Sequence, residues 1–214
     1  MIVTVGGIKG GSGKTTVATN LAIMRARAGR DVLLVDADDQ ETATDFTTLR
    51  NERQADGAGY TSIKLTGASV RNEIQRLKAK YDDVVIDTGG RDTTSQRAAL
   101  TVSDVILVPF VPRSFDVWTI EKVSELVEEM RAANPTLKAF TFINRADSRG
   151  SDNEDAARVL EETPALVLLP AVLGQRKAFG NAAAEGLAIT ELKQKDGKAI
   201  EEINALYKCV FDTG

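Results

Sequence analysis

The stretch GGIKGGSGKTT, residues 6–16, has the residue types and the spacing of a phosphate-binding loop. Glycines let a turn direct its backbone N–H groups inward, and a helix after the turn adds its positive N-terminal end, so both attract phosphate oxygens. Lys14 is placed to reach the β- and γ-phosphates of a nucleotide, and the Thr15 hydroxyl to ligate Mg²⁺. We therefore predict a nucleotide phosphate site formed by Gly10, Gly11, Ser12, Gly13, Lys14, Thr15 and Thr16.

Two residues of this stretch depart from the common pattern G-x-x-x-x-G-K-[ST]. Ile8 occupies the position of the first glycine, and Lys9 adds a second lysine directly before Gly10. A solvated surface lysine is one explanation for Lys9, and a role at the phosphates is the other. An accidental glycine-rich turn is the alternative for the whole stretch, but the strand pattern before it and the intact GKTT favour a nucleotide site.

The other residues suited to chemistry are carboxylates. The chain has no histidine and one cysteine, Cys209, which removes the commonest general base and any thiolate cluster within one chain. Asp36 and Asp38 end an apolar run with one residue between them, so their side chains are expected to point the same way. Asp87 ends a second run. Without histidine, a carboxylate is the group best suited to position a water molecule. The alternative for Asp36 and Asp38 is that they are two strand-end carboxylates in a solvated turn with no catalytic role.

Short apolar runs must position these residues. Runs rich in Val, Ile, Leu and Phe suit strands buried on both faces of a parallel sheet, and here they are IVTV, DVLLVDA, DVVIDT, DVILVPF, AFTFIN and ALVLLP. Residues 15–28 and 114–132 read as helices, the second from its apolar periodicity. The alternation predicts right-handed βαβ units with ligands at the carboxyl ends of the strands. Residues 41–67 are polar and weakly periodic, so no element is predicted there.

Composition limits the class of protein. With 214 residues, 43% apolar and 27% charged, the chain is predicted to form one α/β domain over residues 1–214, a mostly parallel twisted sheet flanked by helices. A formal charge of −4 argues against coating nucleic acid through overall charge and leaves room for a local basic patch. The first residues lack a signal-peptide pattern and no run approaches 18 apolar residues, so we expect a cytoplasmic protein.

Several blocks carry a family resemblance. KGGSGKTT resembles the deviant phosphate loop of the ParA/MinD family of P-loop ATPases. VLLVDADDQ is similar to the family's first switch, usually written D-x-D-P-Q, and YDDVVIDTGG to its second metal-binding strand and second switch. SDVILVPFVPRSFD, TFINRADSRG and LGQRKAFGNAAAEGLAITEL follow in the family's order, so the resemblance covers nearly the whole chain. It implies a P-loop ATPase that uses ATP and Mg²⁺.

The resemblance also implies a role for each candidate residue. In ParA-like ATPases two subunits face each other across two ATP molecules, and the first lysine crosses to the partner's phosphates as an arginine finger does. The expected catalytic residues are Lys9, Lys14 and Asp38, the last by orienting the attacking water. The expected metal shell is Thr15, Asp36 and Asp87. Asn144 is the candidate for the adenine edge, with a strand-end turn asparagine as the alternative.

Two positions differ from the family pattern. Asp39 stands where proline is usual in the first switch, and Gly89-Gly90 replaces the more usual proline-containing turn of the second. The glycines are expected to make this segment mobile and responsive to a γ-phosphate. Their effect on turnover is left open.

Other classes share this loop. Iron–sulfur reductases need paired cysteines across a dimer, and arsenite-pump ATPases are duplicated and cysteine-dependent, so neither class is expected. A MinD-type protein binds membrane through a basic amphipathic C-terminal helix, whereas acidic residues in the last segment favour a core-packing helix here. An ATP-dependent metabolic ligase stays as an alternative, although no acceptor-site motif is evident.

ParA-type partition of DNA is the function that we predict. Such ATPases bind DNA without sequence preference as the ATP dimer, and the tentative contacts here are Arg176 and Lys177, with Arg145, Arg149, Lys193 and Lys195 as further basic candidates. An N-terminal helix-turn-helix domain is not expected, so a separate centromere-binding, ParB-like partner is. We expect slow, partner-stimulated ATP hydrolysis in a nucleoid-associated homodimer that segregates plasmid or chromosomal DNA. Positioning of carboxysomes or conjugation machinery is the alternative cargo.

Overall fold

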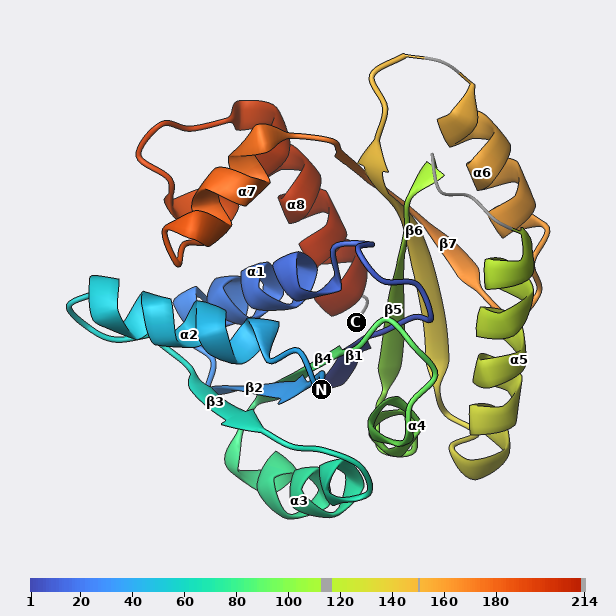
Figure 1. The fold of residues 1–214 in the computed structure, drawn as a ribbon, viewed down its shortest axis with the longest axis horizontal. Coiled ribbons are helices and arrows are strands. Elements are labelled where there is room, and N and C mark those ends of the chain that lie inside the picture. Colours follow the sequence, from blue (N-terminus) through green and yellow to red (C-terminus); the bar gives the residue numbers. More distant parts are fainter. Residues whose placement is uncertain (113–116, 150, 213–214) are drawn as a thin grey trace.

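The computed structural model describes residues 1–112, 117–149 and 151–212. The described residues form a parallel sheet of seven strands (Figure 1). In spatial order the strands are β3 (Thr61–Lys64), β2 (Val32–Ala37), β4 (Asp83–Thr88), β1 (Ile2–Val5), β5 (Val105–Phe110), β6 (Lys138–Ala146) and β7 (Val167–Gly174). All six predicted runs are strands, and the predicted α/β fold class is confirmed.

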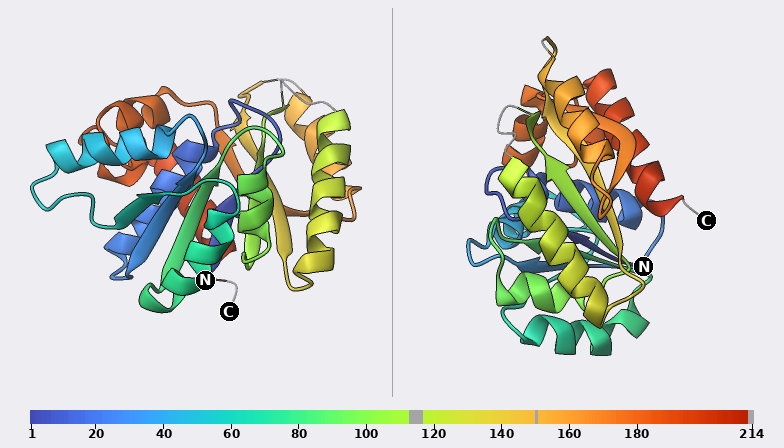
Figure 2. Two further views of the ribbon diagram at one scale, coloured as in Figure 1. Left: turned by 60° about the horizontal axis from the view of Figure 1, so that its bottom comes forward. Right: turned by 90° about the vertical axis from the view of Figure 1, so that its right-hand side faces the viewer.

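Helices cover both faces of the sheet (Figure 2). They are α1 (Lys14–Arg27), α2 (Thr42–Arg53), α3 (Ser69–Leu77), α4 (Thr94–Leu100), α5 (Val117–Ala133), α6 (Asp152–Glu161), α7 (Lys177–Ala184) and α8 (Gly197–Phe211), with short 3₁₀ turns η1 (Lys78–Lys80) and η3 (Ile189–Glu191). The predicted helices over 15–28 and 114–132 correspond to α1 and α5. Residues 114–116 of the second prediction lie outside the described part of the chain.

Alternate residues of each strand build the two apolar layers. Val3 and Val5 of β1 pack in a cluster with α1, α7 and α8, whereas Ile2 belongs to the cluster that includes α3 and α4. A third cluster lies where α5 and α6 cover β5 and β6. The central strands β1, β2, β4 and β5 are buried at every residue. Burial on both faces is why their sequences are continuous apolar runs rather than alternating ones.

The polar region over residues 41–67, for which we predict no element, contains α2 and β3. The N-terminus of α2 has no side-chain cap from its own flanking residue Glu41. Asp36, at the end of β2, caps it instead, because its Oδ2 accepts hydrogen bonds from Thr44 N and Thr44 Oγ1, both at 2.8 Å. Because the cap comes from the end of the preceding strand, the residues that flank α2 carry no cap signal.

The predicted core packing of the terminal helix is confirmed. Four residues of α8 at helical spacing are buried against the sheet, namely Ala199, Ile203, Leu206 and Val210. Arg25 of α1 holds the end of this helix, with its guanidinium carbon 4.5 Å from the centre of the Phe211 ring. Among the described residues no helix is long and apolar enough to cross a membrane.

Truncating a buried side chain of α8 tests this assignment. Leu206→Ala should lower the free energy of unfolding by about 2–5 kcal/mol, because it removes apolar contacts and leaves a cavity. Glu201→Gln, on the exposed face of the same helix, should change it by less than about 0.5 kcal/mol. Urea unfolding followed by circular dichroism measures both, and equal stability of the two variants would show that α8 is not part of the core.

Candidate nucleotide-binding site

The loop between β1 and α1 has the backbone geometry that its glycines allow. Gly11 and Gly13 have φ angles of +74° and +90°, in the left-handed region that other residues rarely adopt. Gly13 is also crowded, since a Cβ atom there would lie 2.5 Å from Asn144 Nδ2. The loop then leads directly into α1, so its N–H groups and the helix N-terminus converge on one place.

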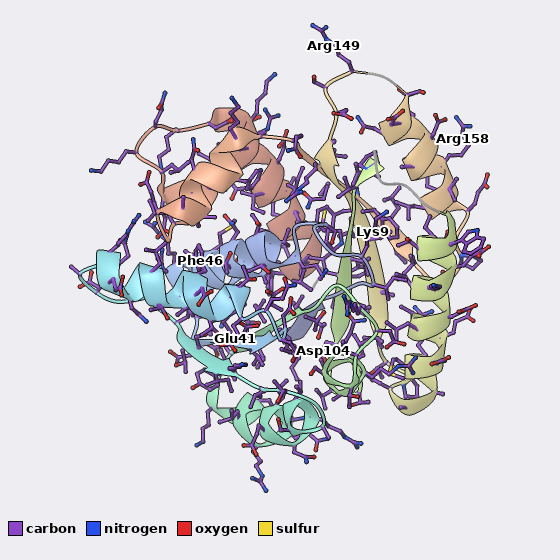
Figure 3. All side chains as sticks on the ribbon, viewed as in Figure 1. Lys9, Glu41, Phe46, Asp104, Arg149 and Arg158 are labelled. Atoms are coloured by element: carbon purple, nitrogen blue, oxygen red, sulfur yellow. The ribbon has the colours of Figure 1, made fainter. Side chains whose placement is uncertain are left out.

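Ile8 has a packing role that explains the departure from the usual glycine. Its side chain is partly buried against the apolar cluster that contains Val108, Phe110 and Val123. These residues also line a small cavity directly below the loop. Ile8 thereby fixes the first half of the loop to β5 and α5, and the neighbouring Lys9 is held at the sheet's carboxyl edge (Figure 3).

Lys14 lies inside the loop rather than on the surface. Its side chain is 6% exposed, and Nζ donates a 2.9 Å hydrogen bond to the Lys9 carbonyl oxygen. Burial lowers the pKa of Lys14, and the carboxylates of Asp87 and Asp38 act in the opposite direction. The Lys14 ammonium is therefore hydrogen-bonded to the backbone of Lys9, so the two lysines of the stretch are directly linked.

Asp87 is a fully buried carboxylate, and neither of its oxygens has a hydrogen-bond partner among the described residues. Burial raises its pKa to about 7, while the neighbouring Thr15 hydroxyl and Lys14 ammonium act against that rise. An unsatisfied buried carboxylate beside a hydroxyl fits Mg²⁺ and its bound water. The described residues contain no cluster of three or more His, Cys, Asp or Glu that would hold a metal alone, so the phosphates and water must complete its shell.

Asp36 lies beside Asp87 because the two are paired in the register of β2 and β4. It is also fully buried, but both of its oxygens are engaged: Oδ2 with Thr44, and Oδ1 with the Asp38 N–H at 3.1 Å. Of the three residues predicted for the metal shell, Asp87 keeps both oxygens without a hydrogen-bond partner among the described residues, whereas Asp36 holds α2 and the first switch. The roles of Thr15, Asp36 and Asp87 toward Mg²⁺ stay predictions.

The second switch contacts the first switch and the phosphate loop through two glycines. A Cβ atom on Gly89 would lie 3.0 Å from Asp38 Oδ1, and one on Gly90 would lie 2.6 Å from Gly10 N and Cα. Asp38 Oδ1 itself accepts a hydrogen bond from Gln40 N at 3.1 Å. The predicted water-positioning carboxylate therefore lies against the second switch, which lies against the loop backbone.

Gln96 is a site residue that the sequence analysis missed. It is fully buried on α4, and its Oε1 accepts hydrogen bonds from Gly7 N at 3.0 Å and Thr88 Oγ1 at 2.9 Å. It thus ties the start of the phosphate loop to the start of the second switch. Its spacing could have revealed it. Gln96 lies three residues before Ala99 and four before Leu100, so on a helix these three residues share one face, and that face is buried in α4.

Two joined clefts open at the carboxyl edge of the sheet. The first, which we call the phosphate cleft, has a volume of about 630 Å³ and is lined by the loop, Asp38 and residues 88–91. The second, the base cleft, has a volume of about 470 Å³ and includes Asn144, Phe179 and Ile203. Both clefts share Gly13, Thr16 and Arg145. Their sizes and mixed lining suit a triphosphate and a nucleoside in sequence.

Asn144 lies in the base cleft, where it also braces the loop. Its Nδ2 donates to the Ser12 carbonyl oxygen at 2.6 Å, and its Oδ1 accepts from Arg145 N at 3.0 Å. Arg145 follows with a φ of +53°, which is unusual for a residue with a side chain. The strand-end geometry of β6 thus serves the loop directly; the contact of Asn144 with adenine stays a prediction.

The basic candidates for DNA contact do not form a single cluster. Arg176 pairs with Glu202, whose Oε2 accepts hydrogen bonds from Arg176 Nε at 2.9 Å and from Gly174 N at 3.0 Å. Arg176 and the exposed Lys177 both line the base cleft. Lys193 and Lys195 line a separate groove near α7 and α8. Arg149 extends from the far tip of the loop after β6 (Figure 3). Their contact with DNA stays a prediction.

Comparison with known proteins identifies the family. Residues 3–189 match the family described as the CobQ/CobB/MinD/ParA nucleotide binding domain. The chain belongs to this family. The resemblance to ParA/MinD ATPases read from the sequence is thereby confirmed, and the chain carries a nucleotide-binding P-loop fold.

Relatives in this family position different cargoes. The chain is 29% identical to the maintenance of carboxysome distribution protein A of Halothiobacillus neapolitanus, over 94% of this chain and 92% of that protein. It is 29% identical to the chromosome partitioning protein ParA of Myxococcus xanthus, over 75% of this chain and 69% of that one. The structure of Cyanothece McdA in complex with ATP has the same fold, with a TM-score of 0.81, 18% identity and coverage of 100% and 96%.

The raised pKa of Asp87 predicts a pH dependence of stability. A carboxyl whose pKa is higher in the folded than in the unfolded protein stabilises the fold below the unfolded value of about 4 and loses this contribution as pH rises through about 7. In nucleotide- and magnesium-free protein, the free energy of unfolding should therefore fall by about 1–2 kcal/mol between pH 5.5 and pH 7.5 on account of this group. Asp87→Asn should remove that part of the fall.

Urea unfolding at both pH values measures the difference. Asp39→Asn, which changes an exposed carboxylate in the same region, is the matched control and should leave the pH slope unchanged. If Asp87→Asn keeps the wild-type slope, Asp87 is not protonated in the folded protein near neutral pH.

Proposed function

We propose that this chain is an ATP-dependent, dimerising switch that segregates DNA, with slow ATP hydrolysis stimulated by a centromere-binding partner. The observation that carries the ATPase assignment is the buried, unpartnered Asp87 carboxylate beside Thr15 and Lys14, under a glycine-rich loop. Such a carboxylate is costly to keep unless a cation and its water accompany it. ATP with Mg²⁺ supplies both the cation and the phosphate anions that the loop attracts.

The mechanism follows from the chain's own groups. Backbone N–H groups of residues 10–16 and the Lys14 ammonium bind the phosphates. Thr15 and, through a water, Asp87 would hold Mg²⁺, which would supply positive charge at the phosphate oxygens. Asp38 orients the attacking water, because no histidine is present to do so. Lys9 acts on the phosphates of the second subunit and adds a cation where the transition state spreads negative charge.

The assignment to DNA rests on the family and on exposed basic residues. ATP-dependent dimerisation would bring two sets of such residues to one surface and so form a local basic patch on a protein whose formal charge is −4 per chain. Lys177, Lys193 and Lys195 are exposed and are the candidates, whereas the charge of Arg176 is balanced by Glu202. On this proposal the protein is cytoplasmic and associates with the nucleoid.

A second cargo is favoured by a specific observation. The carboxysome-distribution relative matches 94% of this chain and 92% of its own length, a more complete match than that of the Myxococcus ParA. The same ATP switch would then position a protein compartment rather than a plasmid or chromosome. A MinD-like membrane role is disfavoured, because the apolar face of α8 is used in the core.

ATP turnover in the presence and absence of nonspecific duplex DNA tests the proposal. We expect slow turnover, binding to unrelated duplexes with similar affinity only when ATP is present, and a steep loss of binding as salt rises because phosphate contacts release counterions. Lys14→Ala should lose nucleotide binding and therefore DNA binding. ATP-dependent binding to anionic vesicles with none to DNA would instead support the MinD-like reading, and co-purification of a shell protein would support the carboxysome cargo.

The dimer is tested through Lys9. Lys9→Ala should keep most of the monomer's affinity for ATP, because Lys14 and the loop backbone hold the phosphates in the same subunit. It should lose ATP-dependent dimerisation, turnover and DNA binding together, because one missing cation in a desolvated phosphate interface is costly. Light scattering with a nonhydrolysable ATP analogue measures dimerisation. Lys80→Ala, which removes an exposed lysine from the turn η1 away from the site, is the control, and a Lys9→Ala protein that dimerises normally would contradict the assignment.

A further inference from the structure

The phosphate cleft has two chemically distinct ends. Arg145 lines both the phosphate cleft and the base cleft, so it marks the end near the nucleoside. Gly10, Asp38 and residues 89–91 line only the phosphate cleft. If the nucleoside occupies the base cleft, the terminal phosphate of ATP lies at this second end, close to the carboxylate that we expect to orient water.

Arg91 is the cation that the second switch brings to this terminal end. The residue before it, Gly90, rests on the backbone of Gly10, since a Cβ atom there would lie only 2.6 Å from Gly10 N and Cα. The residue after it, Asp92, is held by Arg97 through two hydrogen bonds of 2.7 Å each. Arg91 is therefore fixed between a contact with the phosphate loop and an anchor on α4.

The guanidinium of Arg91 is exposed and makes no hydrogen bond or ion pair with any residue in the described ranges. Its neighbour Arg97 differs sharply, because it is paired with both Asp92 and Glu129. An arginine without a counter-ion at the lining of a phosphate site is suited to a phosphate, whose oxygens match the guanidinium's paired N–H donors.

We propose that Arg91 binds the terminal phosphate of ATP from within the same subunit and so makes the second switch respond to ATP but not to ADP. This inference rests on the proposed function in taking the nucleotide to be ATP. Binding would hold residues 89–92 against the loop, and the pairing of Asp92 and Glu129 with Arg97 would pass this constraint to α4 and α5. Lys9 acts across the dimer, whereas Arg91 acts within its own subunit.

The test compares the affinity of the protein for a nonhydrolysable ATP analogue with its affinity for ADP, at protein concentrations below dimerisation. Arg91→Gln should weaken the ATP analogue about 10- to 100-fold, as expected for the loss of charge-assisted hydrogen bonds, and should change ADP affinity by less than about threefold. Arg91→Lys should restore part of the difference. Arg71→Gln, an exposed arginine on α3, is the matched control and should change neither affinity.

The possible outcomes are distinct. Selective loss of ATP affinity in Arg91→Gln supports the proposal. An unchanged preference for ATP over ADP, or an equal loss for both nucleotides, overturns it and leaves the proposed function standing. A loss seen only at concentrations where the dimer forms also overturns it, because Arg91 would then act on the partner's nucleotide. Failure of the wild-type protein to bind either nucleotide overturns both this inference and the proposed function.

Discussion

One buried carboxylate determines how the carboxyl edge of this sheet is organised. Asp87 is fully buried, and neither of its oxygens has a hydrogen-bond partner among the described residues. Burial of a charged group costs several kcal/mol and is the physical cause of the raised pKa of Asp87. The surrounding groups reduce that cost without removing it, because the Lys14 ammonium and the Thr15 hydroxyl lower the pKa of Asp87 and burial still dominates. Such a site is suited to a cation, and the adjoining loop is suited to the anions that would accompany one.

Close backbone contact connects that site to the rest of the molecule. Gly89 lies against the Asp38 carboxylate and Gly90 against the Gly10 backbone, so the second switch contacts both the first switch and the phosphate loop. At the base of the same loops, Gln96 bonds both Gly7 and Thr88. A shift in one segment must therefore move the others, because packed backbone cannot deform continuously. The glycines that replace the family's usual proline turn allow this close contact, because a Cβ atom at Gly90 would collide with the Gly10 backbone.

The sequence predicted the parts of the fold whose signals are local. Continuous apolar runs located the six main strands, and the loop pattern located Lys14 and Thr15. It did not predict α2, because the cap of this helix comes from Asp36 at the end of β2. It did not predict β3, because β3 is a short, half-exposed edge strand. It also did not predict that Asn144 braces Ser12 or that Glu202 neutralises Arg176. These contacts join residues far apart in the chain, and residue type alone does not reveal a partner.

The absence of histidine gives the proposed switch its kinetic character. A carboxylate is a weak base toward water, so on the proposed mechanism Asp38 would orient the nucleophile and do little to deprotonate it. Its Oδ1 is also bonded to Gln40, which ties the orientation of the carboxylate to the conformation of the first switch. In such a site the rate of hydrolysis would depend on the cations at the phosphates and on the conformation of the two switches, rather than on a strong general base. A partner that stabilises that conformation would therefore control the rate, which is what a positioning ATPase requires.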